Sequence, residues 1–149
     1  VTVPIVGNGD IQTSDDVLAM LSETGCDLVM AGRALAARPW MMWQLGEDLG
    51  FAPPPGKTGK APRSRAEEGA EYGKALLRYI ELLPNYFTAE SLAIRKLRFH
   101  IRTTSMWLPF GHTLVSISTK EKTLKDIELR LQEFFSQSIE MSPRTELRQ

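Results

Sequence analysis

The sequence predicts an α/β fold in which the last strand–helix–strand–helix (βαβα) quarter of a (β/α)8 TIM barrel is followed by a small C-terminal helical bundle. Two apolar, β-branched runs, residues 1–6 and 26–31, each end in a glycine-containing turn and are separated by a helical pattern. Three amphipathic helical patterns come later in the chain. Because two parallel strands cannot bury both of their faces, the first segment requires neighbouring strands.

The predicted elements of the first fifty residues follow one another closely. After the first strand and its turn, Thr13 and Asp16 have the spacing of a helix capping box. Gly25 is placed where a glycine commonly ends a helix. Residues 26–31 form the second predicted strand, and a further helical stretch follows in which Pro39 fits a first turn. Short loops of this kind favour parallel strands joined by a right-handed crossover.

The rest of the chain is predicted to be helical after a linker that is rich in Pro, Gly and Lys. Three helices that together form a small bundle are predicted over residues 66–84, where Pro84 ends the helix, from about Thr88 to about Thr104 with Thr88 as N-cap, and from about Thr119 to about Ser136. The predicted division is a barrel end at residues 1–50, a linker or flexible loop at 51–65, a helical domain at 66–139 and a flexible tail at 140–149.

Composition limits the classes of protein to which the chain can belong. Hydrophobic residues make up 42% and charged residues 24%, which is ordinary for a soluble globular protein. No apolar run reaches the roughly 18 residues of a membrane span. The single cysteine, Cys26, excludes an internal disulfide and fits a reducing compartment, so we expect a cytoplasmic protein without a signal peptide. Because Val1 already lies in a predicted strand, we expect the chain to be a piece of a longer protein.

No residue of the chain is predicted to be catalytic. Cys26 begins the second predicted strand, at the opposite end from the glycine turns, and is interpreted as a buried structural cysteine. His100 and His112 lie in the helical part and match no catalytic motif, so packing or surface roles are expected. No spacing of Cys, His, Asp or Glu indicates a metal site.

Two turns at the carboxyl ends of the predicted strands form the candidate site. Asn8, Gly9 and Asp10 follow the first strand, and Gly32 and Arg33 follow the second. In (β/α)8 barrels the active site lies at this face, and phosphate often binds after the last two strands. Glycines let backbone amides approach a phosphate, a helix N-terminus adds partial positive charge, and an arginine adds a forked contact. The residues alone leave open that the glycines only make tight turns, with Arg33 paired to Asp10 or another acid.

Positive charge is concentrated in the second part of the chain. Residues 1–50 hold two basic and seven acidic residues, a balance of −5, whereas residues 51–149 have a balance of +5. Such asymmetry hints that the second part meets a polyanion, although a chance mixture of solvated surfaces remains open.

One predicted helix carries four basic residues and no acid between them: Arg95, Lys96, Arg98 and Arg102. On a helix Arg95, Arg98 and Arg102 share a face, while Leu97 and Ile101 lie on another and can enter the core. This stripe suits a phosphate backbone and would give affinity without sequence specificity. A second basic cluster is expected in the loop, at Lys57, Lys60, Arg63 and Arg65. The residues alone leave open a solvated face that pairs with Glu90 or Glu81.

Two runs of the sequence, residues 4–11 (PIVGNGDI) and 24–40 (TGCDLVMAGRALAARPW), resemble the end of the barrel in tRNA-dihydrouridine synthases. The remainder is similar to the C-terminal helical domain of that family, including the runs Arg95-Lys96 and Trp107-Leu108-Pro109. The resemblance is tight over residues 4–40 and loose from residue 66 onward. It implies that FMN is the cofactor, with its phosphate held by Asn8, Gly9, Asp10, Gly32 and Arg33.

The resemblance implies an oxidoreductase that reduces the C5–C6 double bond of particular uridines in tRNA, with NADPH as the reductant of the flavin. The target base must be unstacked to enter the pocket. The family's cysteine acid, and a lysine and histidine near the flavin and base, lie on earlier barrel segments, so we expect this chain alone to be inactive. The resemblance also implies that the basic stripe contacts tRNA. Leu97 stands where a histidine often follows Arg-Lys in the family, which leaves the target uridine open.

Two other functions remain open from the sequence. A non-catalytic tRNA- or RNA-binding module rests on the basic helix and predicts binding that weakens steeply with salt. A fragment of another FMN TIM-barrel oxidoreductase, such as a dihydroorotate dehydrogenase-like protein, rests on a phosphate grip that many barrels share. In either case strands without partners are association-prone edges. We therefore expect the sheet to pair with the missing N-terminal barrel segment or to form a self-dimer through its exposed edge.

Overall fold

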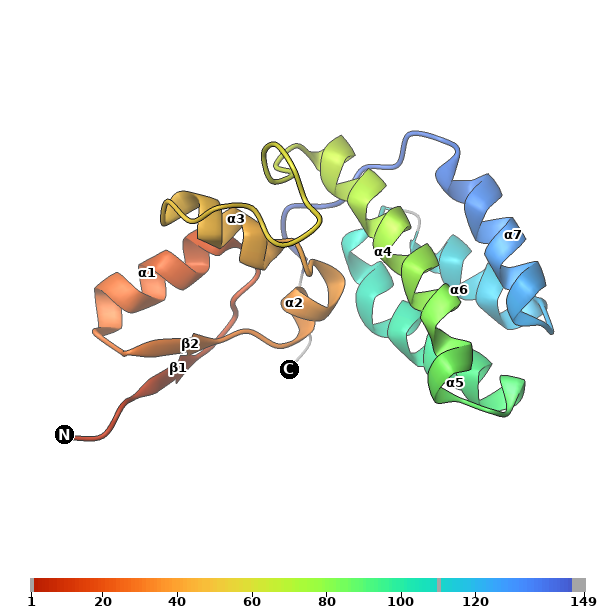
Figure 1. The fold of residues 1–149 in the computed structure, drawn as a ribbon, viewed down its shortest axis with the longest axis horizontal. Helices are drawn as coiled ribbons and strands as arrows, with labels where there is room; N and C mark the ends of the chain where they lie inside the picture. Colours follow the sequence, from red (N-terminus) through yellow and green to blue (C-terminus); the bar gives the residue numbers. More distant parts are fainter. Residues whose placement is uncertain (1, 110, 146–149) are drawn as a thin grey trace. The chain divides into compact units, whose positions relative to one another are not determined.

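The computed structural model describes residues 2–109 and 111–145, and the chain divides into two compact units. The N-terminal unit comprises residues 1–63 together with 143–149, and the helical unit comprises residues 64–142. The N-terminal unit contains, in order, β1 (Val6–Asn8), α1 (Ser14–Thr24), β2 (Leu28–Met30), α2 (Arg33–Ala37) and α3 (Met41–Asp48) (Figure 1). The helical unit contains α4 (Arg65–Tyr86), α5 (Glu90–Thr104), the 3-10 helix η1 (Ser105–Trp107), α6 (Gly111–Lys120) and α7 (Leu124–Phe135). The fold is α/β, mostly helical, with a small parallel sheet.

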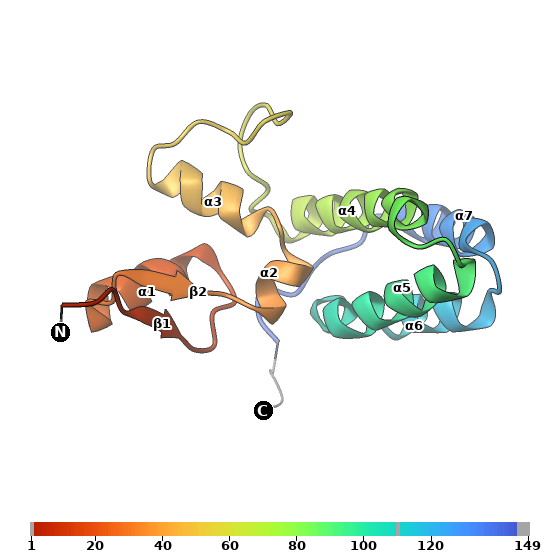
Figure 2. The ribbon, with the colours of Figure 1, turned by 60° about the horizontal axis from the view of Figure 1, so that its bottom comes forward.

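The two strands of the N-terminal unit run parallel, as the sequence predicts (Figure 2). In their register Val6 lies opposite Leu28, and Asn8 lies opposite Met30. Helix α1 connects them and packs against both strands. The first strand has three residues and begins later than predicted. It includes Gly7 and Asn8, which were expected to lie in the turn after the strand. Residue 1 of the predicted strand lies outside the described residues.

One face of this sheet is covered by α1 and the other is open. Gly7 lies under the helix, where a Cβ atom would come within 2.7 Å of the Met20 sulfur and 2.8 Å of the Cys26 sulfur. On the opposite face Val6, Leu28 and Met30 are each more than half exposed. No described residue covers this second face, which is what the sequence predicts for two parallel strands that have no neighbouring strands in the chain.

Self-association through this open face is an expected property of the chain. Leu28→Gln together with Met30→Gln should shift the chain toward monomer, because both side chains leave an apolar surface exposed to water. Sedimentation velocity over a range of concentrations measures the shift. Leu129→Gln is the matched control, because Leu129 is a similarly exposed leucine on α7. An unsubstituted chain that stays monomeric at the highest concentration contradicts the prediction.

Helix α1 begins and ends where the sequence predicts. The Thr13 hydroxyl accepts a hydrogen bond from the Asp16 amide at 3.3 Å, and the Asp16 carboxylate accepts from the amides of Gln12 and Thr13. Burial opposes ionisation of Asp16, but these bonds and one from the Arg144 guanidinium outweigh it and lower the pKa of the carboxyl. Gly25 ends the helix with φ of 66°, a left-handed conformation that favours glycine.

The helical stretch after Gly32 is two helices rather than one. Helix α2 ends at Ala37, and α3 begins at Met41 after a turn that includes Pro39. The proline ring disfavours helical geometry at the preceding residue, Arg38, so the first helix stops there. Pro39 therefore precedes α3 instead of lying in its first turn.

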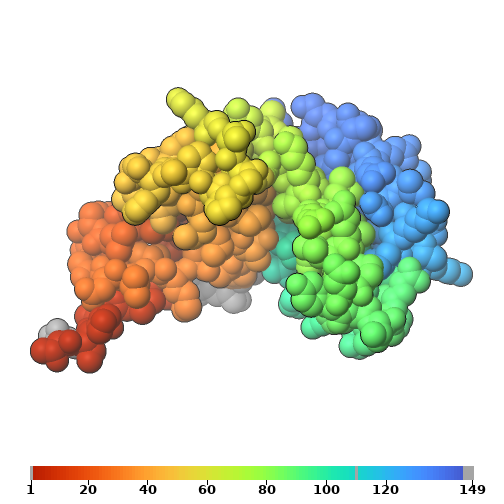
Figure 3. Space-filling view, in the orientation of Figure 1, coloured from red at the N-terminus to blue at the C-terminus, as the bar shows by residue number. Residues whose placement is uncertain are grey.

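The described residues of the helical unit form a bundle of four α-helices rather than the predicted three. Helix α4 packs against α5 and α7, and α6 packs against α5 and α7; in Figure 3 α4 (light green) runs beside α7 (blue). Leu97 and Ile101 of α5 are fully buried, as predicted. The bundle core also contains a row from α4 and a row from α7, namely Tyr72, Leu76, Ile80, Leu83, Leu124, Ile127 and Leu131.

Three boundaries in the helical unit differ from the prediction. Pro84 lies inside the last turns of α4, which continues to Tyr86. The N-cap of α5 is Ala89 rather than Thr88. The predicted helix from Thr119 is α7, which starts later with Thr123 as N-cap, and α6 precedes it. No described helix is long and apolar enough to cross a membrane.

The segment predicted to be a flexible tail is anchored over residues 141–145. Met141 is fully buried in the helical unit. In the N-terminal unit, the Gln12 side chain donates to the Thr145 carbonyl and accepts from the Thr145 amide, both at 2.9 Å. The buried Arg38 guanidinium donates to the carbonyls of Gln12 and Pro143. Residues 141–145 thus have specific contacts in the structure, and residues 146–149 lie outside the described part of the chain.

Candidate functional site

The parallel register brings the two glycine turns to the same edge of the sheet. Both strands end together, because Asn8 lies opposite Met30 in the ladder. Asn8 is the last residue of β1 and is followed by Gly9 and Asp10, whereas Gly32 and Arg33 come just after the end of β2. Figure 1 shows the two strands side by side. All five residues are solvent-exposed. The sequence-predicted site residues thus share one accessible edge.

Gly32 has open space where a side chain would stand. A Cβ atom built on Gly32 meets no atom within 4 Å, whereas one on Gly9 comes within 3.1 Å of the Met20 methyl carbon. Packing within the chain therefore does not require glycine at position 32. A ligand that approaches the backbone closely is a physical reason for glycine there. Gly7, by contrast, has little room for a side chain, because its Cβ atom would come within 3 Å of the sulfur atoms of Met20 and Cys26.

Several backbone amides close to this edge already donate hydrogen bonds within the fold. The Ile11 amide donates to the Gly9 carbonyl at 2.8 Å, and the Gln12 and Thr13 amides donate to Asp16. With its own capping box and with acids at Asp15 and Asp16, the N-terminus of α1 does not attract an anion.

The start of α2 differs from the start of α1. Its N-cap is Gly32, and no side chain of the described residues caps it. Arg33 is the first residue of this helix. An exposed Arg33 and an exposed Asp10 nearly cancel in charge, so backbone amides must provide most of the attraction for an anion.

The basic helix α5 presents three of its four predicted cations to solvent. Arg95, Lys96 and Arg102 are exposed, and none of them forms an ion pair with a described residue. The predicted competing partners are otherwise engaged, since Glu81 binds Arg78 at 2.7 Å and Glu90 accepts from the Leu124 amide at 2.8 Å. Three cations on one helix face give a surface that suits phosphate groups.

Arg98 forms contacts within the helical unit, and its contact with RNA stays a prediction. Its Nε donates to the Ser118 carbonyl at 2.7 Å, and its Nη2 donates to the carbonyls of Thr119 and Glu121. These carbonyls lie at and just beyond the C-terminal end of α6, where helix carbonyls lack partners and attract positive charge. Arg98 therefore joins α5 to the end of α6.

Phe99, which is not among the predicted site residues, lies on the same exposed face of α5. Its side chain is 71% exposed. The spacing could have revealed it, because Phe99 follows Arg95 by four residues and precedes Arg102 by three.

Three of the four residues in the second predicted basic cluster, Lys57, Arg63 and Arg65, have contacts within their own units. The Arg63 guanidinium binds the carboxylates of Glu47 and Asp48. The hydrogen bond to Asp48 raises the pKa of Arg63, although partial burial of the guanidinium acts in the opposite direction. In the helical unit, Arg65 contacts the Glu140 carboxylate at 3.5 Å. Lys57 lies over the Trp43 ring, 5.8 Å from its centroid. The side chains of Arg63, Arg65 and Lys57 thus have partners within the chain.

Cys26 and His100 have packing roles. Cys26 is buried against Gly7 and Met20, just before β2 and therefore at the end of the sheet away from the turns. The His100 ring lies 4.8 Å from the Tyr79 ring, and burial lowers the pKa of the imidazole. Among the described residues no three Cys, His, Asp or Glu side chains are grouped as metal ligands.

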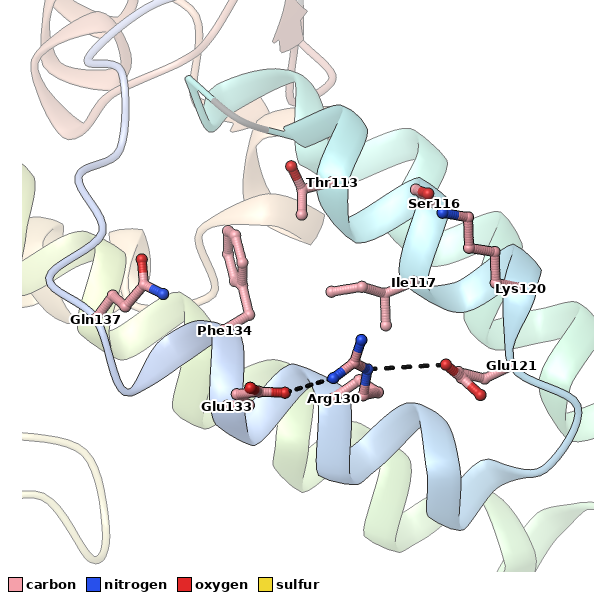
Figure 4. Close-up of a pocket in the computed structure, with 9 residues that line it drawn as sticks. All are labelled: Thr113, Ser116, Ile117, Lys120, Glu121, Arg130, Glu133, Phe134 and Gln137. Carbon is pink, nitrogen blue, oxygen red and sulfur yellow. Dashed lines mark hydrogen bonds and ion pairs between the residues drawn. The ribbon is translucent and has the colours of Figure 1, made fainter.

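A pocket of about 350 Å³ lies between α6 and α7 in the helical unit (Figure 4). Ile117 and Phe134 line it, and Arg130 lies between the carboxylates of Glu121 and Glu133. Lys120 and Arg130 are balanced by these two acids, so the pocket has no net charge to select an ionic ligand.

Comparisons with known proteins assign relatives to most of the chain. Residues 1–108 match the family model described as dihydrouridine synthase. A probable tRNA-dihydrouridine synthase of Mycobacterium leprae is 33% identical over 130 residues, which cover 87% of this chain and 31% of that protein. The tRNA-dihydrouridine synthase B of Pseudomonas syringae pv. tomato is 29% identical over 140 residues, which cover 92% of this chain and 38% of that protein. The chain thus spans about a third of the length of these curated relatives.

Proposed function

The chain belongs to the dihydrouridine synthase family, and on that premise we propose that it is the C-terminal portion of a flavin-dependent tRNA-dihydrouridine synthase. The whole enzyme would reduce the C5–C6 double bond of a uridine in tRNA, with FMN as cofactor and NADPH as reductant. Relatives named tRNA-dihydrouridine synthase support the substrate and the reaction class. The family match favours this reading over a fragment of another FMN barrel oxidoreductase.

The observation that carries the cofactor proposal is the shared edge at which both glycine turns lie. Asn8, Gly9 and Asp10 from one turn and Gly32 and Arg33 from the other would hold the FMN phosphate. The open space at Gly32 would let a phosphate approach the backbone closely. The Arg33 guanidinium would add a charged, forked contact.

Bound FMN would supply hydride chemistry toward C6 of the uracil ring. The role of this chain in that chemistry is to hold one end of the cofactor. We do not assign an acid to it, since Cys26 is its single cysteine and lies at the end of the sheet away from the turns. We therefore propose that these 149 residues by themselves form no dihydrouridine.

The open face of the sheet fits a barrel quarter. Val6, Leu28 and Met30 point away from α1 and are exposed, as inward-facing barrel residues would be when the other strands are absent. In this proposal the remaining strands come from other residues of the whole enzyme, and the helical unit holds tRNA through α5.

An FMN titration of the protein that contains this chain tests the cofactor site. Gly32→Ala should weaken FMN binding at least tenfold, because its methyl group would occupy the space required by the phosphate. Gly46→Ala is the matched control, because its Cβ atom would make only an ordinary contact of 3.8 Å with Phe51. Quenching of flavin fluorescence measures both affinities, and circular dichroism checks the fold.

The outcomes of this titration separate the candidate functions. Equal affinities for Gly32→Ala, Gly46→Ala and the unsubstituted protein would remove the glycine edge as the phosphate site. Loss of FMN binding with tRNA binding intact in Gly32→Ala agrees with the proposed enzyme. A protein that binds tRNA but no FMN would instead be the non-catalytic RNA-binding module.

A further inference from the structure

The exposed face of α5 combines cations with an aromatic ring. Arg95, Lys96 and Arg102 surround Phe99 on this face, while Leu97 on the opposite side is fully buried. With a rise of 1.5 Å per residue, the Phe99 Cα lies about 6 Å along the helix from that of Arg95 and about 4.5 Å from that of Arg102. The ring is therefore at the centre of the cationic surface rather than at its margin.

An exposed phenylalanine among cations differs from an isolated apolar residue on a surface. Single exposed hydrophobic residues are common and require no explanation. Here Leu92, which is 40% exposed, lies seven residues before Phe99 and extends the same face of α5. Cations interleaved with an exposed aromatic ring are the chemistry of proteins that bind single-stranded nucleic acid, in which bases stack on the ring.

We propose that Phe99 is a base-stacking residue for an unpaired nucleotide of the bound RNA, with Arg95, Lys96 and Arg102 on the flanking phosphates. The inference rests on the proposed function, in which the helical unit holds tRNA. It adds the requirement that the RNA segment over α5 has at least one base free of its own stack. In a duplex the bases stack on one another, so the Phe99 ring would have no base face to contact.

The two kinds of contact have different dependence on salt. Phosphate contacts from the three cations release counterions, so their contribution falls as salt rises. Stacking on a neutral ring releases no counterion. Removal of the ring should therefore lower RNA affinity by a constant factor at every salt concentration. Removal of a cation should also reduce the slope of log affinity against log salt concentration.

Binding of the full chain to RNA tests the inference with two variants of one residue. Phe99→Leu keeps an apolar side chain but removes the ring, and should weaken binding of tRNA and of single-stranded oligouridine about tenfold. Affinity for an RNA duplex of the same length should be unchanged. Phe99→Trp should restore the affinity, and its exposed indole should be quenched by oligouridine but not by the duplex.

Matched controls make the result specific. Phe51→Leu changes another exposed phenylalanine, in the N-terminal unit, and should leave RNA affinity unchanged. Thermal unfolding of Phe99→Leu should match that of the unsubstituted chain, because the Phe99 side chain is mostly in water.

Each outcome decides between the inference and the proposal on which it rests. If Phe99→Leu binds RNA normally while glutamine substitution of the three cations weakens binding, stacking is excluded and the tRNA-holding role stands. Equal losses for oligouridine and duplex would also exclude stacking. If neither the ring nor the cations affect RNA affinity, the role of α5 in holding tRNA fails, and the inference fails with it.

Discussion

Replacing Gly69 with alanine is expected to destabilise the helical unit by about 3 kcal/mol or more. Gly69 lies inside α4, and a Cβ atom there would be 1.8 Å from the Ile139 carbonyl oxygen and 2.7 Å from its carbon. Both neighbours are backbone atoms, so no side-chain rotation relieves the overlap. Either α4 or the segment after α7 must move.

The segment after α7 cannot move without losing its own contacts. Met141 is fully buried, and its amide donates to the Arg65 carbonyl at 3.0 Å. The Arg65 side chain donates back to the Met141 carbonyl, and the Ser142 amide donates to the Trp107 carbonyl at 2.6 Å. Displacement would break several of these bonds together, which is why the expected cost exceeds that of an ordinary surface substitution.

Urea unfolding of Gly69→Ala and Gly46→Ala measures this effect with its control. Both glycines lie inside helices, where alanine is intrinsically favoured by about 1 kcal/mol. Gly46→Ala should therefore be neutral or stabilising, since its Cβ atom is accommodated. If Gly69→Ala is also stabilising, the close approach of residue 139 to α4 is wrong.

Helix propensity alone predicts that both glycine substitutions increase the free energy of unfolding. The expected difference between them depends on a contact that is distant in the sequence. The start and end of α1 were predictable because Thr13, Asp16 and Gly25 act on backbone groups within a few residues. The parallel pairing followed from a short crossover through one helix. Contacts between residues far apart in the chain, such as Gln12 with Thr145, leave no local pattern.

Helix α6 was not predicted from the sequence, for a related reason. Its sequence, GHTLVSISTK, begins with glycine and is rich in Ser, Thr and β-branched residues, which have low intrinsic helix propensity. Packing decides its conformation, since Leu114 is fully buried in the bundle. Without α6, the sequence could not show that Arg98 faces a helix end rather than solvent.

The candidate site was predictable to the extent that it depends on strand ends. Strands that end in glycine turns place Gly9 and Gly32 at one edge if they pair in parallel, and they do. The sequence could not distinguish the open space above Gly32 from the packed position of Gly7, since both are glycines next to a strand. That difference depends on where Met20 and Cys26 lie.

The exposed cations of α5 are expected to control RNA affinity. Glutamine at Arg95, Lys96 and Arg102 together should weaken tRNA binding about a hundredfold at 0.1 M salt, because three phosphate contacts are lost. The slope of log affinity against log salt should fall by about two to three. Fluorescence anisotropy of labelled tRNA across a salt series measures both quantities.

Two single variants distinguish surface charge from structure in that experiment. Lys125→Gln removes an exposed lysine from α7 and should leave the salt slope unchanged, because it lies outside the α5 surface. Arg98→Gln should instead lower the unfolding midpoint, since three carbonyls at the end of α6 lose their donor. A salt slope that falls equally for Lys125→Gln and for the triple variant would mean that net charge attracts the RNA. A loss confined to α5 would mean that the fold directs the cations, because packing of Leu97 and Ile101 into the core turns these three side chains toward solvent.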